Sequence, residues 1–130
     1  MTKINTEAAK IALTAAFDGF SATPCYYDKA PAKAALPYSV IKRVHISPLE
    51  DGDLLSFMLE LHTDDTLPGS AAALERLCDE YRNNADGALL SDGKNFFGHI
   101  NFDSQQDGDL DAEYDLAHRT QSYSLRLFYI

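Results

Sequence analysis

The chain has 130 residues, of which 45% are hydrophobic and 24% are charged, so it can bury a core and does not have the composition of a disordered protein. Its 20 acidic residues against 11 basic ones give a formal net charge of −9, which excludes a nucleic-acid-binding footprint spread over the whole surface. The sequence contains no run of about 18 apolar residues that would span a membrane, and its first residues do not have the pattern of a signal peptide. We expect a single domain over residues 1–130 in a reducing cytoplasm.

The segment 6–20 predicts a helix that Thr6 can cap and Gly19 can end. Two apolar stripes at helical spacing are available for burial. The first consists of Ala8, Ile11, Ala12 and Ala15, and the second of Leu13, Phe17 and Phe20.

Residues 21–37 have no clear period and contain Pro24, Pro31 and Pro37. Connections within domains are usually about four to six residues long, so a loop of this length is typically functional or held by a partner. Its two aromatic side chains, Tyr26 and Tyr27, predict a contact of that kind.

Two strands joined by a hairpin follow this loop. In residues 37–46 one face is predicted to carry Tyr38, Val40, Val44 and Ile46. Residues 54–62 alternate more regularly, with Leu55, Phe57, Leu59 and Leu61 on one face. Asp51 and Gly52 between the two segments predict an antiparallel hairpin.

Ser70 can cap a second helix, whose apolar face consists of Leu74, Leu77, Cys78 and Tyr81. Cys78 is thus explained as a small buried hydrophobe, although a disulfide with Cys25 stays open. Residues 94–102 and 119–130 predict the closing strands. The order α-β-β-α-β-β indicates an α+β fold: a mainly antiparallel sheet of four to five strands with two helices packed on one face.

The last strand is apolar on both faces. Tyr123, Leu125, Leu127 and Tyr129 point one way, whereas Phe128 and Ile130 point the other way. A sheet with helices on one side is normally polar on the other side. Two explanations remain open: the strand is central in a well-packed monomer, or its second face meets another subunit.

His62 is the starting point of one possible metal site. It precedes Asp64 and Asp65, and His99 or His118 would supply a third ligand if its strand lay next door. His62 falls in the polar phase of its strand, however, and aspartates are common in turns before helices. We therefore expect a solvated turn and no metal ion.

The acidic segment near the end of the chain resembles a calcium-binding loop only in part. Asp107, Asp109 and Asp111 have the spacing of the first three EF-hand ligands. Ala112 and His118 occupy the positions that require Gly and Glu, so we expect no calcium site and no cofactor.

The sequence also favours a protein that is not an enzyme. It has no Gly-x-Ser-x-Gly elbow and no glycine-rich phosphate loop. Cys25 lies in the proline-rich loop, and nothing in the spacing brings a histidine to it as a base. We predict no catalytic residues.

Four features together resemble the small tail-terminator, or tail-completion, proteins of long-tailed bacteriophages and prophages. They are the Pro37-Tyr38 pair that opens the first strand, the Asp-Gly hairpin, the amphipathic second helix and the final sequence EYDLAHRTQSYSLRLFYI. The resemblance extends over nearly the whole chain by the order of elements, whereas its individual motifs are short.

This resemblance implies a structural protein of the virion tail or neck, assembled in the cytoplasm of a host bacterium. Such proteins form a ring, typically a hexamer, that caps the tail tube, ends its growth and joins the head connector or head-completion protein, while DNA passes through the middle. The subunit or partner interface is then expected at Tyr26, Tyr27, Tyr38, Arg126, Phe128 and Ile130.

The net charge of −9 suits a channel in which DNA slides without sticking, because like charges prevent phosphate contacts. We expect some of four aspartates to face the lumen of the ring: Asp103, Asp107, Asp109 and Asp111. The alternative for this segment is a simple solvated loop. The alternative for the whole chain is a small acidic inhibitor or immunity-type protein that binds a basic partner.

Overall fold

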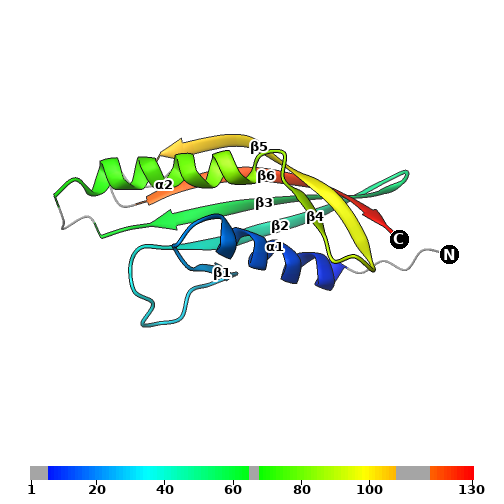
Figure 1. Cartoon of the computed structure of the whole chain (residues 1–130), viewed down its shortest axis with the longest axis horizontal. Helices are drawn as coiled ribbons and strands as arrows, with labels where there is room; N and C mark the ends of the chain where they lie inside the picture. Colours follow the sequence, from blue (N-terminus) through cyan, green and yellow to red (C-terminus); the bar gives the residue numbers. More distant parts are fainter. Residues whose placement is uncertain (1–5, 65–67, 108–117) are drawn as a thin grey trace.

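A computed structural model describes residues 6–64, 68–107 and 118–130 of the chain. The elements in order are α1 (Thr6–Phe20), β1 (Cys25–Tyr27), β2 (Tyr38–Leu49), β3 (Gly52–His62), α2 (Ser70–Ala85), β4 (Leu89–Ser91), β5 (Phe96–Asp107) and β6 (His118–Tyr129). The α+β class is therefore as predicted, and the two helices lie on the same side of one sheet (Figure 1). Neither helix of this described part has an apolar stretch long enough to cross a bilayer.

The sheet has six strands in the order β1-β2-β3-β6-β5-β4. All neighbouring pairs are antiparallel except β1 and β2, which are parallel. The prediction of four to five strands in the order α-β-β-α-β-β was therefore wrong, and the sheet is mixed. The two missed strands, β1 and β4, contain three residues each, which is too short for an alternating pattern to stand out in the sequence.

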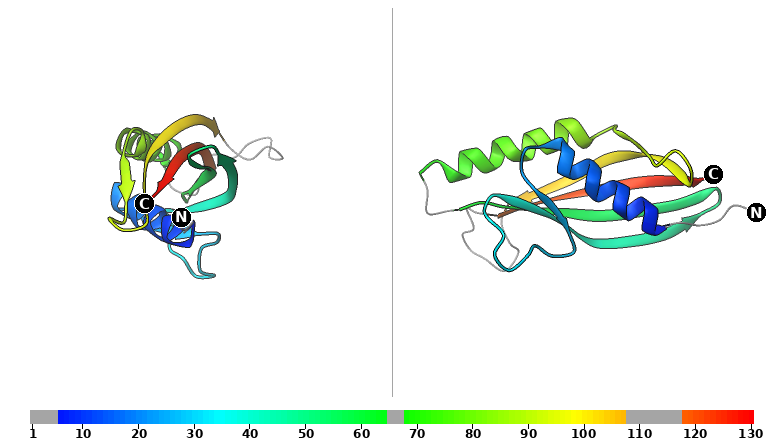
Figure 2. Two further views of the ribbon diagram at one scale, coloured as in Figure 1. Left: turned by 90° about the vertical axis from the view of Figure 1, so that its right-hand side faces the viewer. Right: turned by 60° about the horizontal axis from the view of Figure 1, so that its bottom comes forward.

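The sheet curls around α1, as the view along the long axis of the molecule illustrates (Figure 2, left). Both edge strands, β1 and β4, contact this helix, while α2 packs over β3, β5 and β6. The side of the sheet that faces the helices contains the hydrophobic core. Its opposite side is the outer side of the curl.

Aromatic side chains fill the centre of the core. Phe17 of α1 is fully buried and contacts Phe57 of β3 and Tyr123 of β6 edge to face, with ring centroids 5.6 and 5.2 Å apart. Its ring also stacks on Tyr81 of α2 at 6.1 Å. Such pairs add to the free energy gained from burial alone. Phe17 therefore joins both helices to the two central strands.

The second stripe predicted for α1 faces the core, whereas the first reaches it only through Ala8 and Ala12. Leu13 and Phe17 are buried together with Ala9, whereas Ile11 is 64% exposed. The helix turns its bulkier stripe inward because large side chains gain more from burial than alanines do.

A β-bulge in β2 changes which of its side chains point toward the core. The register with β3 shifts between Lys42 and His45, where Arg43 has a φ of 52°. Before the bulge, Val40 pairs with Glu60 on the outer side; after it, Ile46 pairs with Leu55 of the core. The prediction that Tyr38, Val40, Val44 and Ile46 share one face was therefore wrong, because the extra residue reverses the alternation.

Replacing Phe17 with Ala should lower the free energy of unfolding by about 3–5 kcal/mol, because the substitution leaves a cavity among the rings of Phe57, Tyr81 and Tyr123. Urea titration followed by circular dichroism measures this change. Ile11→Ala on the same helix is the matched control and should change stability by less than about 0.5 kcal/mol, since Ile11 is 64% exposed. Equal effects of the two substitutions would contradict this assignment of the core.

Candidate functional site

The outer side of the sheet is the candidate interaction surface, and we call it the open face. In β3 and β6 the side chains alternate between buried positions toward the helices and half-buried or exposed positions on the open face. The open face of these two strands carries Leu54, Ser56, Met58, Glu60, His62, His118, Thr120, Ser122, Ser124, Arg126 and Phe128. Two aromatic groups lie at its opposite ends, with serines between them.

At one end of the open face a row of rings crosses four strands. Tyr26 of β1 contacts Tyr38 of β2 with ring centroids 6.0 Å apart, and Tyr38 lies 5.1 Å from His62 of β3. His62 in turn stacks on His118 of β6 at 4.6 Å and 9°. We call these four residues the aromatic row. It arises because Tyr38 pairs with His62, and His62 pairs with His118, in the strand registers.

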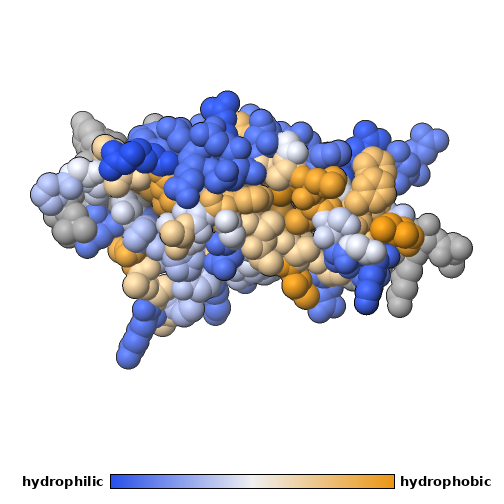
Figure 3. Space-filling model, in the orientation of Figure 1, coloured by the Kyte–Doolittle hydropathy of each residue, from blue (hydrophilic) through white to orange (hydrophobic). Residues whose placement is uncertain are grey.

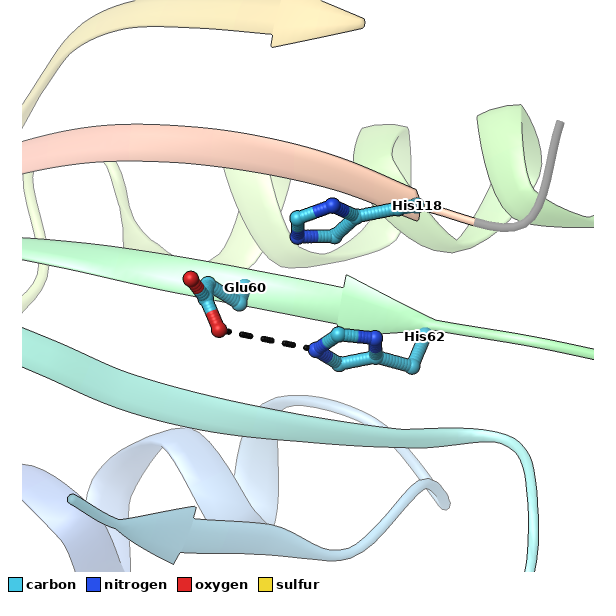
Figure 4. A group of neighbouring side chains, drawn as sticks. All are labelled: Glu60, His62 and His118. Carbon is cyan, nitrogen blue, oxygen red and sulfur yellow. Dashed lines mark ion pairs between the residues drawn. The ribbon is translucent and has the colours of Figure 1, made fainter. Parts of the chain in front are cut away.

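Glu60 lies beside the aromatic row on the same face of β3. Its Oε1 is 3.5 Å from Nε2 of His62, as the dashed line in Figure 4 marks. The same oxygen is 3.2 Å from Nζ of Lys42. Burial lowers the pKa of His62, and His118 acts in the same direction, whereas Glu60 opposes both. Burial therefore dominates, and the neutral imidazole is favoured.

At the other end of the open face lies a second apolar group, which we call the C-terminal cluster: Phe97, Phe128 and Ile130. The rings of Phe97 and Phe128 stack with centroids 5.1 Å apart, and Ile130 is 64% exposed. Arg126 lies over the Phe128 ring at 5.3 Å and forms an ion pair with Asp51 at 3.1 Å. Clustered exposed apolar side chains beside an arginine are typical of protein interfaces.

Five of the six predicted interface residues therefore separate into two groups. Tyr26 and Tyr38 belong to the aromatic row, and Phe128 and Ile130 to the C-terminal cluster with Arg126 beside them. The two groups are well separated, because positions 118 and 128 of β6, one in each group, are about 33 Å apart at roughly 3.3 Å per residue.

Tyr27 belongs to neither group. It pairs with Ile41 on the helix side of the sheet and lines a cavity of about 560 Å³ between α1 and β1, with Ile11 and Cys25. Hydrophobic surface gathers along the seam between the helices in Figure 3. Burial raises the pKa of the Cys25 thiol to about 11, so the reactive thiolate is strongly disfavoured.

The four predicted lumen aspartates are only partly within the described residues. Asp103 is exposed at the irregularity of β5 and accepts a hydrogen bond from Ser124 Oγ at 3.3 Å. Asp107 is the last residue of β5 and pairs with Arg119 in the register. Asp109 and Asp111 lie outside the described residues.

A third ligand beside His62 was expected only if His99 or His118 lay on a neighbouring strand. His118 does, because it pairs with His62, whereas His99 pairs with Arg126 near the other end of β6. Sequence reasoning did not include Glu60 in this group. The signal was available, because residues two apart in a strand point to the same face.

No family model matches the sequence, and no curated protein matches it. Among solved structures, a chain from the virion of a native gene transfer agent particle is similar, with a TM-score of 0.59 and 17% sequence identity. The similarity covers 91% of this chain and 94% of that chain. At this identity the match establishes a shared fold.

The buried thiol and phenols predict an alkaline loss of stability. The pKa of Cys25 is raised from 9.0 to about 11 and that of Tyr81 from 10.0 to about 12, in both cases mainly by burial. As the pH rises, the unfolded chain therefore loses these protons before the folded chain does. The stability that the protonated groups contribute is complete below their pKa values in the unfolded chain, and it is lost as the pH rises through their pKa values in the folded chain. Urea unfolding at about pH 8 and about pH 10 should show a lower free energy at the higher pH.

The variant Cys25→Ala serves as the control for this experiment. Its loss of free energy between the two pH values should be smaller than that of the unaltered protein, because one of the buried acids is absent. Identical pH dependence in both proteins would show that the Cys25 thiol does not contribute.

Proposed function

We propose that this protein is a structural component of a phage-like virion and acts there as a tail terminator. The observation that carries the proposal is the similarity, over 91% of this chain and 94% of the other, to a chain from the virion of a gene transfer agent particle. A fold shared over almost the full length of both chains favours a related structural role. The order of elements, from the N-terminal helix to the apolar last strand, favours the tail terminator among such roles.

The open face supports an assembly role. Exposed clusters of large apolar side chains are uncommon on monomers and mark contact surfaces. Phe97 is 43% exposed and stacks on Phe128, and Ile130, two residues further along the chain, is 64% exposed. We infer that the C-terminal cluster is covered by a neighbouring copy in a ring of about six subunits.

The aromatic row is the second contact surface of the proposal. Tyr26 lies on an edge strand, next to the loop that leads into β2, and Tyr38 opens that strand. Tyrosines supply a large contact area at a low entropic cost, so this end of the open face suits the tail tube protein or the head-completion protein.

The charge of the chain supports passage of DNA through the ring. With a net charge of −9 and Asp103 exposed on β5, phosphate groups would be repelled and would find few cations to bind. The lumen would then guide DNA without holding it.

Phe128→Asp should abolish ring formation and capping of tail tubes, because it places a charge in the apolar contact. Light scattering and electron microscopy of the protein mixed with tail tubes measure both effects. Ile11→Asp is the matched control: it adds the same charge at an exposed apolar position on the helix side, and it should leave rings and capping intact. Circular dichroism verifies that both variants are folded.

Capping that is insensitive to Phe128→Asp would contradict the role of the C-terminal cluster. A protein that stays monomeric with tail tubes and binds only a basic protein would instead indicate the acidic inhibitor.

Reversing the charge of the predicted lumen residues should slow DNA delivery and leave assembly intact. The variant replaces Asp103, Asp107, Asp109 and Asp111 with Lys, which would create phosphate contacts along the DNA path. Particle counts by microscopy measure assembly, and the rate of DNA transfer into cells measures passage. Normal delivery by fully assembled variant particles would show that these aspartates do not face the DNA.

A further inference from the structure

Three side chains that can bind a metal ion meet on the open face: Glu60, His62 and His118 (Figure 4). Glu60 and His62 are two residues apart in β3 and thus point to the same side. His118 is the first residue of β6 and lies directly opposite His62, the last residue of β3. Strand alternation and cross-strand pairing together bring the three groups to one point.

The distances between the ligand atoms of this group can be compared with those around a bound metal ion. The ligand atoms of the three residues lie within 4.8 Å of one another, and Glu60 Oε1 is 3.5 Å from His62 Nε2. Around a tetrahedral zinc ion with bonds of about 2.0–2.1 Å, two ligand atoms are about 3.4 Å apart. The glutamate and one imidazole therefore already have a suitable separation.

Binding by both imidazoles requires the rings to change their relative orientation. The rings of His62 and His118 are nearly parallel, at 9°, with centroids 4.6 Å apart. An ion must lie close to the plane of each imidazole that binds it, so the rings have to tilt toward one another. The side-chain torsions of both residues supply this movement in the proposed bound state, and the strand backbones stay in register.

The donor set determines the class of ion. Two imidazoles and one carboxylate suit zinc and its neighbours among the divalent transition metals, whereas magnesium and calcium prefer oxygen ligands throughout. Three protein ligands leave a fourth position of the ion available for water or for a group from another protein. The side chains of His62 and Glu60 are 29% and 19% exposed, so an ion can reach these two ligands from solvent, whereas Nε2 of His118 is buried.

We propose that Glu60, His62 and His118 form a binding site for a divalent transition-metal ion, with Zn²⁺ as the ion that fits best. The bound ion would link the end of β3 to the start of β6, and its stabilisation of the folded chain would grow with the logarithm of the ion concentration once that concentration exceeds the Kd. Lys42 competes with the ion, because its ammonium group lies 3.2 Å from Glu60 Oε1. The site is independent of the proposed role in a virion, since one copy of the chain supplies all three ligands.

The test uses the full chain without an affinity tag. Zn²⁺ binding is measured by isothermal titration calorimetry, and Co²⁺ serves as a spectroscopic probe whose visible absorption reports coordination by nitrogen and oxygen. We expect one ion per chain and an increase in the melting temperature with Zn²⁺. His62→Ala and His118→Ala should each weaken binding by at least about tenfold. Glu60→Gln should also weaken it, and this variant keeps the size of the side chain in case a histidine variant does not fold.

Three control variants make the assignment specific. His45→Ala and His99→Ala remove the two other histidines of the chain and should leave binding unchanged. Lys42→Ala should tighten binding, because it removes the competing cation. The proposal is overturned if the unaltered protein does not bind Zn²⁺ at micromolar concentrations, if binding depends on His45 or His99, or if Lys42→Ala weakens it.

Discussion

The antiparallel pairing of β3 with β6 is the interaction on which the rest of this structure depends. It joins Asp53–His62 to His118–Leu127 in one uninterrupted register. On the helix side this register aligns Phe57 with Tyr123, and both rings pack against Phe17. On the open face the same register sets His62 opposite His118. One set of backbone hydrogen bonds thus fixes the core and the candidate site together, and a slip of one residue would move every side chain to the wrong face.

The two faces of this sheet serve different purposes. The helix face gains its stability from burial, with aromatic rings that connect α1 and α2 to the central strands. The open face contributes less to folding and instead presents the aromatic row at one end and the C-terminal cluster at the other. Because both groups lie on one continuous sheet, the distance between them is fixed by the strands.

The spacing of apolar residues predicted the secondary structure correctly where a segment was long and its period was clear. The alternation from Leu55 to Leu61 predicted a strand with that face buried, and the spacing from Leu74 to Tyr81 predicted the second helix. The prediction failed in the short strands β1 and β4 and at the bulge of β2. A strand of three residues has no measurable period, and the bulge depends on how two strands fit together after they have met.

The sequence by itself determined the α+β class and the inward faces of β3 and β6, because each depends on residues near one another in the chain, and its composition determined the net negative charge. The pairing of β6 with β3 and the meeting of Glu60, His62 and His118 were decided only by the tertiary structure. These contacts join segments more than fifty residues apart, and no local preference encodes which strand lies next to which. The outcome depends on the burial of one shared core, a free energy that exists only once the whole sheet has closed around α1.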